Sequence, residues 1–200
     1  MQPAVLATIA ANLVPIAGVL AMGWSPFEVF ALYWTENLVI GLYTILKFWC
    51  ADPGDAGVPP IARLGMSVFF AFHYGIFNFV HGAFIVVFFA GESVMSGNGF
   101  AMPTSLVDGP TWSLAALGLL ASHGITFVTT FWGRERRRSS LQNLMGAPYG
   151  RVIAMHLTLL AGGFLLFLVG NSAPLLALLV ALKTVVDLRT LRREQARSAT

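Results

Sequence analysis

Charged residues are scarce in this sequence of 200 residues, of which only 10% are Asp, Glu, Lys or Arg. A soluble domain carries about a quarter charged residues, so the composition excludes an ordinary water-soluble protein. Hydrophobic residues make up 56% of the chain, and its mean hydropathy is +0.74. The composition therefore predicts an integral membrane protein whose first partner is the lipid bilayer.

Other absences exclude several kinds of function. The chain has one cysteine, Cys50, and so has no second thiol for an internal disulfide. The net charge of +3 is small and the basic residues are clustered, so nucleic-acid binding is not expected. The sequence contains no G-x-S-x-G, P-loop or H-E-x-x-H pattern, which leaves covalent hydrolase chemistry without support.

Long apolar runs are abundant. A membrane helix needs about 20 mainly apolar residues, and six segments meet that need: 4–22, 27–48, 64–90, 112–133, 152–170 and 173–188. What remains is too short for a soluble domain, so residues 1–200 are expected to form a single integral membrane domain. The predicted fold class is all-α, a polytopic bundle of about six transmembrane helices.

Basic residues fall on alternate connections between these segments. Lys47 and Arg63 flank 49–63, five arginines lie within 134–151 and four follow residue 188, whereas 91–111 has acidic residues and no base. The positive-inside rule makes the basic connections cytoplasmic, which predicts that both termini are inside. The run GRERRR is interpreted mainly as this topology signal, with contact to anionic lipid as the alternative.

Ionisable side chains within the spans are the candidates for function, because each is costly in hydrocarbon. They are Glu36, all four histidines of the chain, and Lys183 with Asp187. The helical rise places Glu36, His73 and His123 about 15–16 Å from the basic residue at the inner end of each span. These three are therefore expected at one level near the midplane. His156 is expected lower, about 8 Å above Arg151.

The stretch FHYGIFNFVHG at 72–82 holds two histidines with Asn78 between them. His81 lies about 12 Å along the helix from His73 and about 80° around it. That separation is too large for both imidazoles to bind one ion easily. The two are expected to serve two sites, or one site and one structural contact.

Two imidazoles and a carboxylate at one depth are the ligand set of non-haem iron and of catalytic zinc. The sequence thus predicts a transition-metal site, zinc or iron, on Glu36, His73 and His123. The other two histidines, His81 and His156, are further candidate ligands. Three polar residues are expected around the site: Asn37, Asn78 and Lys183.

Two other interpretations of these residues stay open. In the first, Glu36 pairs with Lys183 and the histidines only form hydrogen bonds between helices. In the second, His73 and His123 are the axial ligands of a b-type haem. Glycines lie within two residues of His73, His81 and His123, which would leave room for the flat macrocycle.

Several phrases, in this order, resemble a family of bacterial and archaeal multi-spanning membrane proteins that is described only as a domain of unknown function. The phrases are NLVPIAGVL, YWTENLVIG, HYGIFNFVHG, SHGITF, LMGAPYGRVIAMH and LKTVVDL. The resemblance covers nearly the whole chain and implies a helical membrane fold, with no activity attached. Glu36, Asn37 and the four histidines lie within these phrases.

The function expected from these residues is that of a metal-dependent enzyme of the bacterial inner membrane, acting on a lipid-like or small apolar substrate. One alternative is an electron-transfer subunit that holds a b-type haem. Another is a non-catalytic or pigment-binding subunit of a larger membrane complex. A homo-oligomer is an open alternative for its assembly.

Overall fold

The structure, a computed structural model, describes residues 26–52, 57–95 and 110–169, together with the single positions 181, 184, 185 and 189. Every regular element within these ranges is helical, which confirms the predicted all-α class for this part of the chain. The elements are α2 (Pro26–Cys50), α3 (Pro60–Met95), α5 (Pro110–Thr126), η1 (Phe127–Glu135), α6 (Leu141–Gly146) and α7 (Tyr149–Val169).

Three helices are long and apolar enough to cross a membrane: Phe27–Cys50, Pro60–Val87 and Ser113–Gly133. They coincide with the predicted spans 27–48, 64–90 and 112–133. Each of α2, α3 and α5 starts at a proline, whose fixed φ and missing N–H suit the first helical position. Residues 152–169 of the predicted span 152–170 are helical within α7, while span 4–22 and all of span 173–188 except positions 181, 184 and 185 lie outside the described residues.

The chain divides into two compact units, and the larger, Ala31–Val152, holds most of the described elements. Within it α2 and α3 are antiparallel. The Trp34 indole N–H donates to the Asn78 carbonyl oxygen at 2.7 Å, and the Tyr74 hydroxyl donates to the Asn37 carbonyl oxygen at 3.0 Å. As the α2 number rises, the α3 number falls, which is the register of an antiparallel pair.

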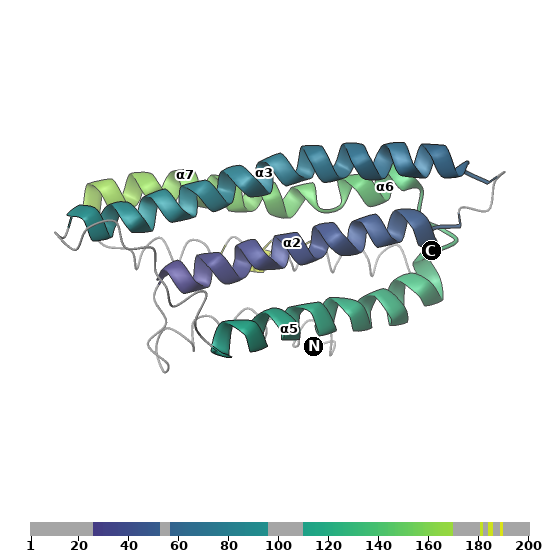
Figure 1. Cartoon of the computed structure of the whole chain (residues 1–200), viewed down its shortest axis with the longest axis horizontal. Helices are drawn as coiled ribbons and strands as arrows, with labels where there is room; N and C mark the ends of the chain where they lie inside the picture. Colours follow the sequence, from purple (N-terminus) through teal and green to yellow (C-terminus); the bar gives the residue numbers. More distant parts are fainter. Residues whose placement is uncertain are drawn as a thin grey trace. The chain divides into compact units, whose positions relative to one another are not determined.

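α5 packs against α2, and in Figure 1 α2 lies between α3 and α5. The contact is made by Tyr43, whose hydroxyl donates to the Leu120 carbonyl oxygen at 2.9 Å. One turn further along α2, Lys47 Nζ lies 5.3 Å from the centre of the Phe131 ring in η1. The two contacts come in the same order along α2 and along α5–η1, so these two helical segments run parallel.

The buried residues of α3 recur every three or four positions, as expected for one face of a helix, and they include polar side chains. They are Ser67, Phe70, Tyr74, Asn78, His81 and Ile85. The outer face carries large apolar residues instead, with Phe72 and Phe79 exposed by 72% and 75%. A helix that buries its polar residues and exposes aromatic ones suits hydrocarbon rather than water as its surroundings.

Two arginines hold the elements together at the end of α2. The Arg63 guanidinium donates to the carbonyl oxygens of Phe48 and Ala51 at 2.6 and 2.8 Å, which satisfies backbone acceptors left open where a helix ends. Arg136 Nη2 lies 3.8 Å from Asp52 Oδ2. These contacts join the end of α2 to the start of α3 and to the segment after η1.

Residues 134–151 were expected to be a connection at the cytoplasmic face, but part of this segment packs into the core. α6 buries Leu141 and Leu144 in a hydrophobic cluster with Phe48 and Phe70. Pro148 then interrupts the helical run, since it has no N–H to donate. α7 begins at Tyr149, and the Pro148 carbonyl accepts from the N–H groups of Arg151 and Val152.

Close packing of α2 on α3 generates the first prediction. A Cβ at Gly41 would lie 2.8 Å from Tyr74 Cε1, inside contact distance, whereas a Cβ at Gly75 meets nothing within 4 Å. Gly41→Ala should therefore destabilise the fold by about 1–3 kcal/mol through overpacking. The matched control Gly75→Ala should be neutral or gain about 0.5–1 kcal/mol from helix propensity. Thermal unfolding in detergent measures both, and equal midpoints would contradict the described packing.

Candidate functional site

The Glu36 carboxylate, near the middle of α2, meets side chains from two other helices. The Arg151 guanidinium donates from Nη1 to Glu36 Oε1 at 3.1 Å. His123 Nε2 lies 3.7 Å from the same oxygen. The Glu36 side chain is 13% exposed, and those of His123 and Arg151 are 24% and 27% exposed. Helices α2, α5 and α7 thus bring a carboxylate, an imidazole and a guanidinium to one place.

Local sequence explains how His123 reaches this position. The imidazole stacks on the Tyr43 ring, with centroids 6.3 Å apart and planes at 30°. The next residue, Gly124, has no side chain, and a Cβ there would lie 2.8 Å from the Tyr43 hydroxyl oxygen. Glycine is therefore needed for Tyr43 to approach α5 and hold His123 beside α2.

Arg151 owes its place to the interruption at Pro148. It occupies the first turn of α7, where the backbone N–H groups of a helix start create a positive potential. Tyr74 of α3 lies within electrostatic range of both Arg151 and Glu36, and its hydroxyl is bound to the Asn37 carbonyl. The cluster is therefore bordered by α3 as well.

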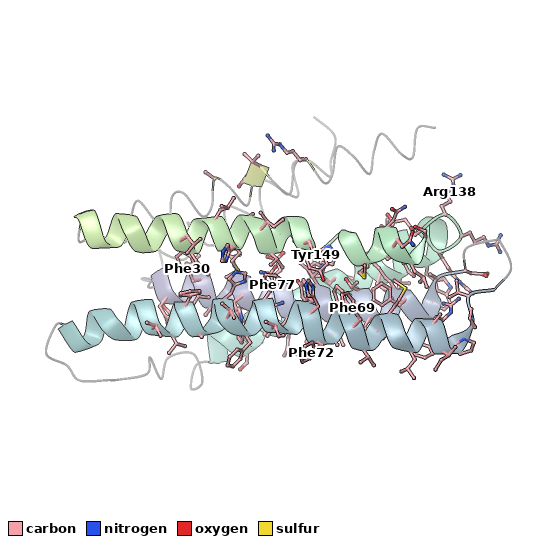
Figure 2. The ribbon with its side chains drawn as sticks, turned by 90° about the horizontal axis from the view of Figure 1, so that it is seen from above. Phe30, Phe69, Phe72, Phe77, Arg138 and Tyr149 are labelled. Carbon is pink, nitrogen blue, oxygen red and sulfur yellow. The ribbon has the colours of Figure 1, made fainter. Side chains whose placement is uncertain are left out.

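His73 makes a different contact from the one expected. Its Nδ1 lies 2.7 Å from the Tyr149 hydroxyl. The imidazole stacks on Phe69, with centroids 5.3 Å apart and planes at 10°, and meets Phe77 edge-on at 5.2 Å. Figure 2 shows Phe69, Phe77 and Tyr149 close together between α3 and the start of α7, with Phe72 turned away. The His73 side chain itself is exposed.

His81 and Asn78 lie on the buried face of α3, each only 1% exposed. Asn78 Nδ2 donates to the Tyr74 carbonyl at 2.9 Å, while its Oδ1 has no hydrogen-bond partner among the described residues. Gly82 leaves room for the Trp34 indole, which a Cβ would meet at 3.0 Å. The two histidines of FHYGIFNFVHG therefore have unlike surroundings, since His81 is buried and His73 is exposed.

The residues predicted to bind a metal are only partly brought together. Glu36 and His123 meet, but His73 is bound to Tyr149 instead. No group of three His, Cys, Asp or Glu side chains that could hold a metal ion occurs in the part of the chain that the structure describes. The Arg151 guanidinium at Glu36 also opposes a cation at that oxygen, because like charges repel strongly at such short range.

The other predicted residues are placed as follows. His73 and His123 belong to α3 and α5, with α2 between them in Figure 1, an arrangement that does not favour one haem bound by both. The Asn37 side chain is buried on α2. His156 belongs to the smaller compact unit, and Lys183 lies outside the described residues.

Sequence reasoning missed Arg151 and Tyr149. Arg151 was expected at the cytoplasmic edge with the other arginines of 134–151, and the structure corrects this by pairing it with a carboxylate in the middle of α2. The depth expected for His156 was counted from Arg151 as a residue at the cytoplasmic edge, so that depth no longer has a basis. The phrase GAPYGR could have indicated that a helix begins here, because a proline shortly before an apolar run favours a helix start.

The pairing of Glu36 generates the second prediction. Arg151→Met should destabilise the protein by about 3–5 kcal/mol, because it removes the guanidinium that is paired with a carboxylate in an apolar setting. The double variant Glu36→Gln with Arg151→Met should recover most of that loss. Thermal unfolding of the single and double variants in detergent measures the coupling.

The comparison for this cycle is Glu36→Gln with Lys183→Met, since Lys183 was the cation expected from the sequence. We expect that adding Glu36→Gln to Lys183→Met recovers none of any stability lost in Lys183→Met alone. Recovery with Lys183 and none with Arg151 would show that the ion pair described here is not the one that stabilises the protein.

Comparison with known proteins adds a family and no activity. The model of a family of unknown function, DUF6498, matches residues 1–200. No match was found among curated proteins or among solved structures. Because the family match covers the whole sequence, the chain belongs to the DUF6498 family of unknown function.

Proposed function

We propose that this chain is a multi-pass protein of the bacterial inner membrane that binds the acidic group of a membrane-soluble molecule at Arg151. The observation that carries the proposal is the contact of Arg151 with Glu36 at 3.1 Å, with His123 3.7 Å from the same oxygen. Three apolar helices and the aromatic outer face of α3 support the membrane location.

Arginine is the side chain best suited to this role. Its planar guanidinium binds carboxylate, phosphate or sulfonate groups through two parallel hydrogen bonds. Arg151 also lies on the first turn of α7, and the start of a helix favours anions. Glu36, to which Arg151 is bound, is a charged residue within an apolar span, and such residues are costly and mark candidate functional sites.

Glu36 would compete with an acidic ligand for Arg151, and protonation of Glu36 would weaken that competition. When Glu36 is ionised, it occupies Arg151 and the pair is neutral. When Glu36 takes a proton, its attraction for Arg151 falls, and an anionic ligand at Arg151 restores the same net charge. His123, at 3.7 Å, is placed to pass that proton to the carboxylate. Because the total charge is unchanged, the exchange avoids leaving an unpaired ion in an apolar setting.

The third prediction tests this exchange with a probe that stays ionised at any pH used. Purified protein in nonionic detergent should bind hexadecanesulfonate but not hexadecanol, because only the sulfonate offers the guanidinium an anion. Glu36→Gln, which resembles the protonated carboxyl, should bind hexadecanesulfonate more tightly than the parent protein, because the competing carboxylate is gone. Methanesulfonate, which has the anion without the chain, separates a lipid-like ligand from a water-soluble one. Thermal shift and equilibrium dialysis measure binding.

Two variants serve as controls. His156→Gln leaves Glu36, His123 and Arg151 in place and should bind as the parent protein does. Glu36→Gln with Arg151→Met removes the cation and should lose the sulfonate. Equal binding of hexadecanesulfonate by the parent protein and this double variant would reject Arg151 as the binding residue.

A transition metal bound by Glu36 and His123 is the second candidate, favoured by their 3.7 Å separation. It requires Arg151 to leave the carboxylate and a further ligand to complete the usual set of three or more. The fourth prediction follows from this requirement. If metal binds, Arg151→Met should raise the bound zinc or iron and Glu36→Gln should abolish it, as measured by elemental analysis. Metal content that is unchanged in both variants would end this candidate.

A further inference from the structure

We propose that His73, Tyr149, Phe69 and Phe77 form a second site, open to the membrane, that binds a planar ring carrying a carbonyl oxygen, the chemistry of a quinone. This site is separate from the Glu36 cluster and does not depend on the function proposed for it. It rests on one exposed imidazole whose orientation is fixed by its neighbours.

The exposed position of His73 is unusual for α3. The other exposed side chains on this part of the helix are apolar, among them Phe69 at 54% and Phe72 at 72%. A polar ring on such a surface is unfavourable in hydrocarbon unless it has hydrogen-bond partners. Tyr149 satisfies one ring nitrogen, and among the described residues none binds Nε2, which is therefore available to a molecule dissolved in the membrane.

The neighbours of His73 fix the imidazole on three sides. The Tyr149 hydroxyl holds Nδ1 at 2.7 Å, Phe69 stacks parallel to the ring at 5.3 Å, and Phe77 meets its edge at 5.2 Å. Tyr149 is itself packed edge-on against Phe70 and Tyr74. The side chain that holds the imidazole is thus held in turn, so the ring is oriented before any ligand arrives.

The direction of the hydrogen bond between Tyr149 and His73, which depends on the imidazole tautomer, decides what Nε2 can recognise. When the phenol donates to Nδ1, the neutral imidazole carries its hydrogen on Nε2. Nε2 is then a donor on an exposed ring and needs an acceptor such as a carbonyl oxygen. Tyr149 is therefore a positioning residue, and His73 is the residue that contacts the ligand.

The aromatic neighbours decide the shape of the ligand. Phe69 and Phe77 are 54% and 38% exposed, and exposed aromatic faces favour a flat partner in offset or edge-to-face packing. A quinone combines such a ring with carbonyl acceptors and dissolves in the bilayer. No electron transfer is required, because the proposal concerns binding alone.

The fifth prediction compares two probes on the full chain in nonionic detergent. Menadione should bind, as measured by equilibrium dialysis, and methylnaphthalene, which has the same ring system without the carbonyl oxygens, should bind more weakly. His73→Leu should weaken menadione binding roughly five- to tenfold, the effect of one hydrogen bond. Tyr149→Phe should weaken it in the same direction, because it keeps the ring packing but releases Nδ1.

Phe72→Leu is the matched control, since it removes an exposed aromatic residue from the same helix on the side turned away from Tyr149. It should bind menadione as the parent protein does, and so should Glu36→Gln. Conversely, His73→Leu should leave hexadecanesulfonate binding unchanged, so failure at one site is distinguishable from failure at the other.

Several results would overturn the proposal. Equal binding of the two probes would show that the carbonyl is not recognised, and unchanged binding in His73→Leu would show that the imidazole is not the donor. A change of oligomeric state in His73→Leu without menadione binding would make this face a contact between copies. A Soret band in the parent protein that His73→Leu abolishes would make His73 a haem ligand instead.

Discussion

The arrangement of the larger unit depends on how the charge of Glu36 is neutralised. A carboxylate in the middle of an apolar helix needs a cation nearby, because removing one partner of such a pair leaves an uncompensated charge at a cost of about 3–5 kcal/mol. The cation is Arg151, which lies far away in the sequence and comes from another helix. For Arg151 to reach Glu36, α7 has to begin near the middle of α2. The preceding residues therefore have to run inward, which explains why α6 packs Leu141 and Leu144 into the core.

α3 also contributes to the surroundings of the Glu36 pair. Its buried face is where Tyr74 packs against Gly41 and donates to the Asn37 carbonyl, one residue from Glu36. Its flank is where His73 meets Tyr149, two residues before Arg151. Aromatic rings connect the buried face of α3 to the side of α3 that carries His73, since Tyr74 and Tyr149 pack edge-on with centroids 6.0 Å apart. One helix thus contacts both polar clusters without carrying a formal charge between residues 64 and 91.

The sequence allows the helical class, three of the apolar helices and the mid-helix position of Glu36 to be predicted, because hydropathy and helical rise depend only on local residues. The contact of Glu36 with His123 is also consistent with the equal depths predicted for them. The partner of Glu36 was missed, since Arg151 follows a run of arginines and a charge count treats them alike. His73 was assigned to Glu36 because depth alone does not give rotation, and the side of α3 on which a residue lies depends on what packs against it. Only the burial pattern from Ser67 to Ile85 separates exposed His73 from buried His81.

The two polar clusters are linked through the point at which α7 begins. Tyr149 and Arg151 lie on the same first turn, so one interruption at Pro148 sets the direction of both side chains. Successive residues of a helix are separated by about 100°, so moving the start of α7 by one residue would turn both away from their partners together. The positions of Arg151 and Tyr149 therefore both depend on where α7 begins. The two clusters thus share the first turn of one helix, while each is completed by its own side chains. Glu36 and His123 complete one, and His73 with Phe69 and Phe77 completes the other.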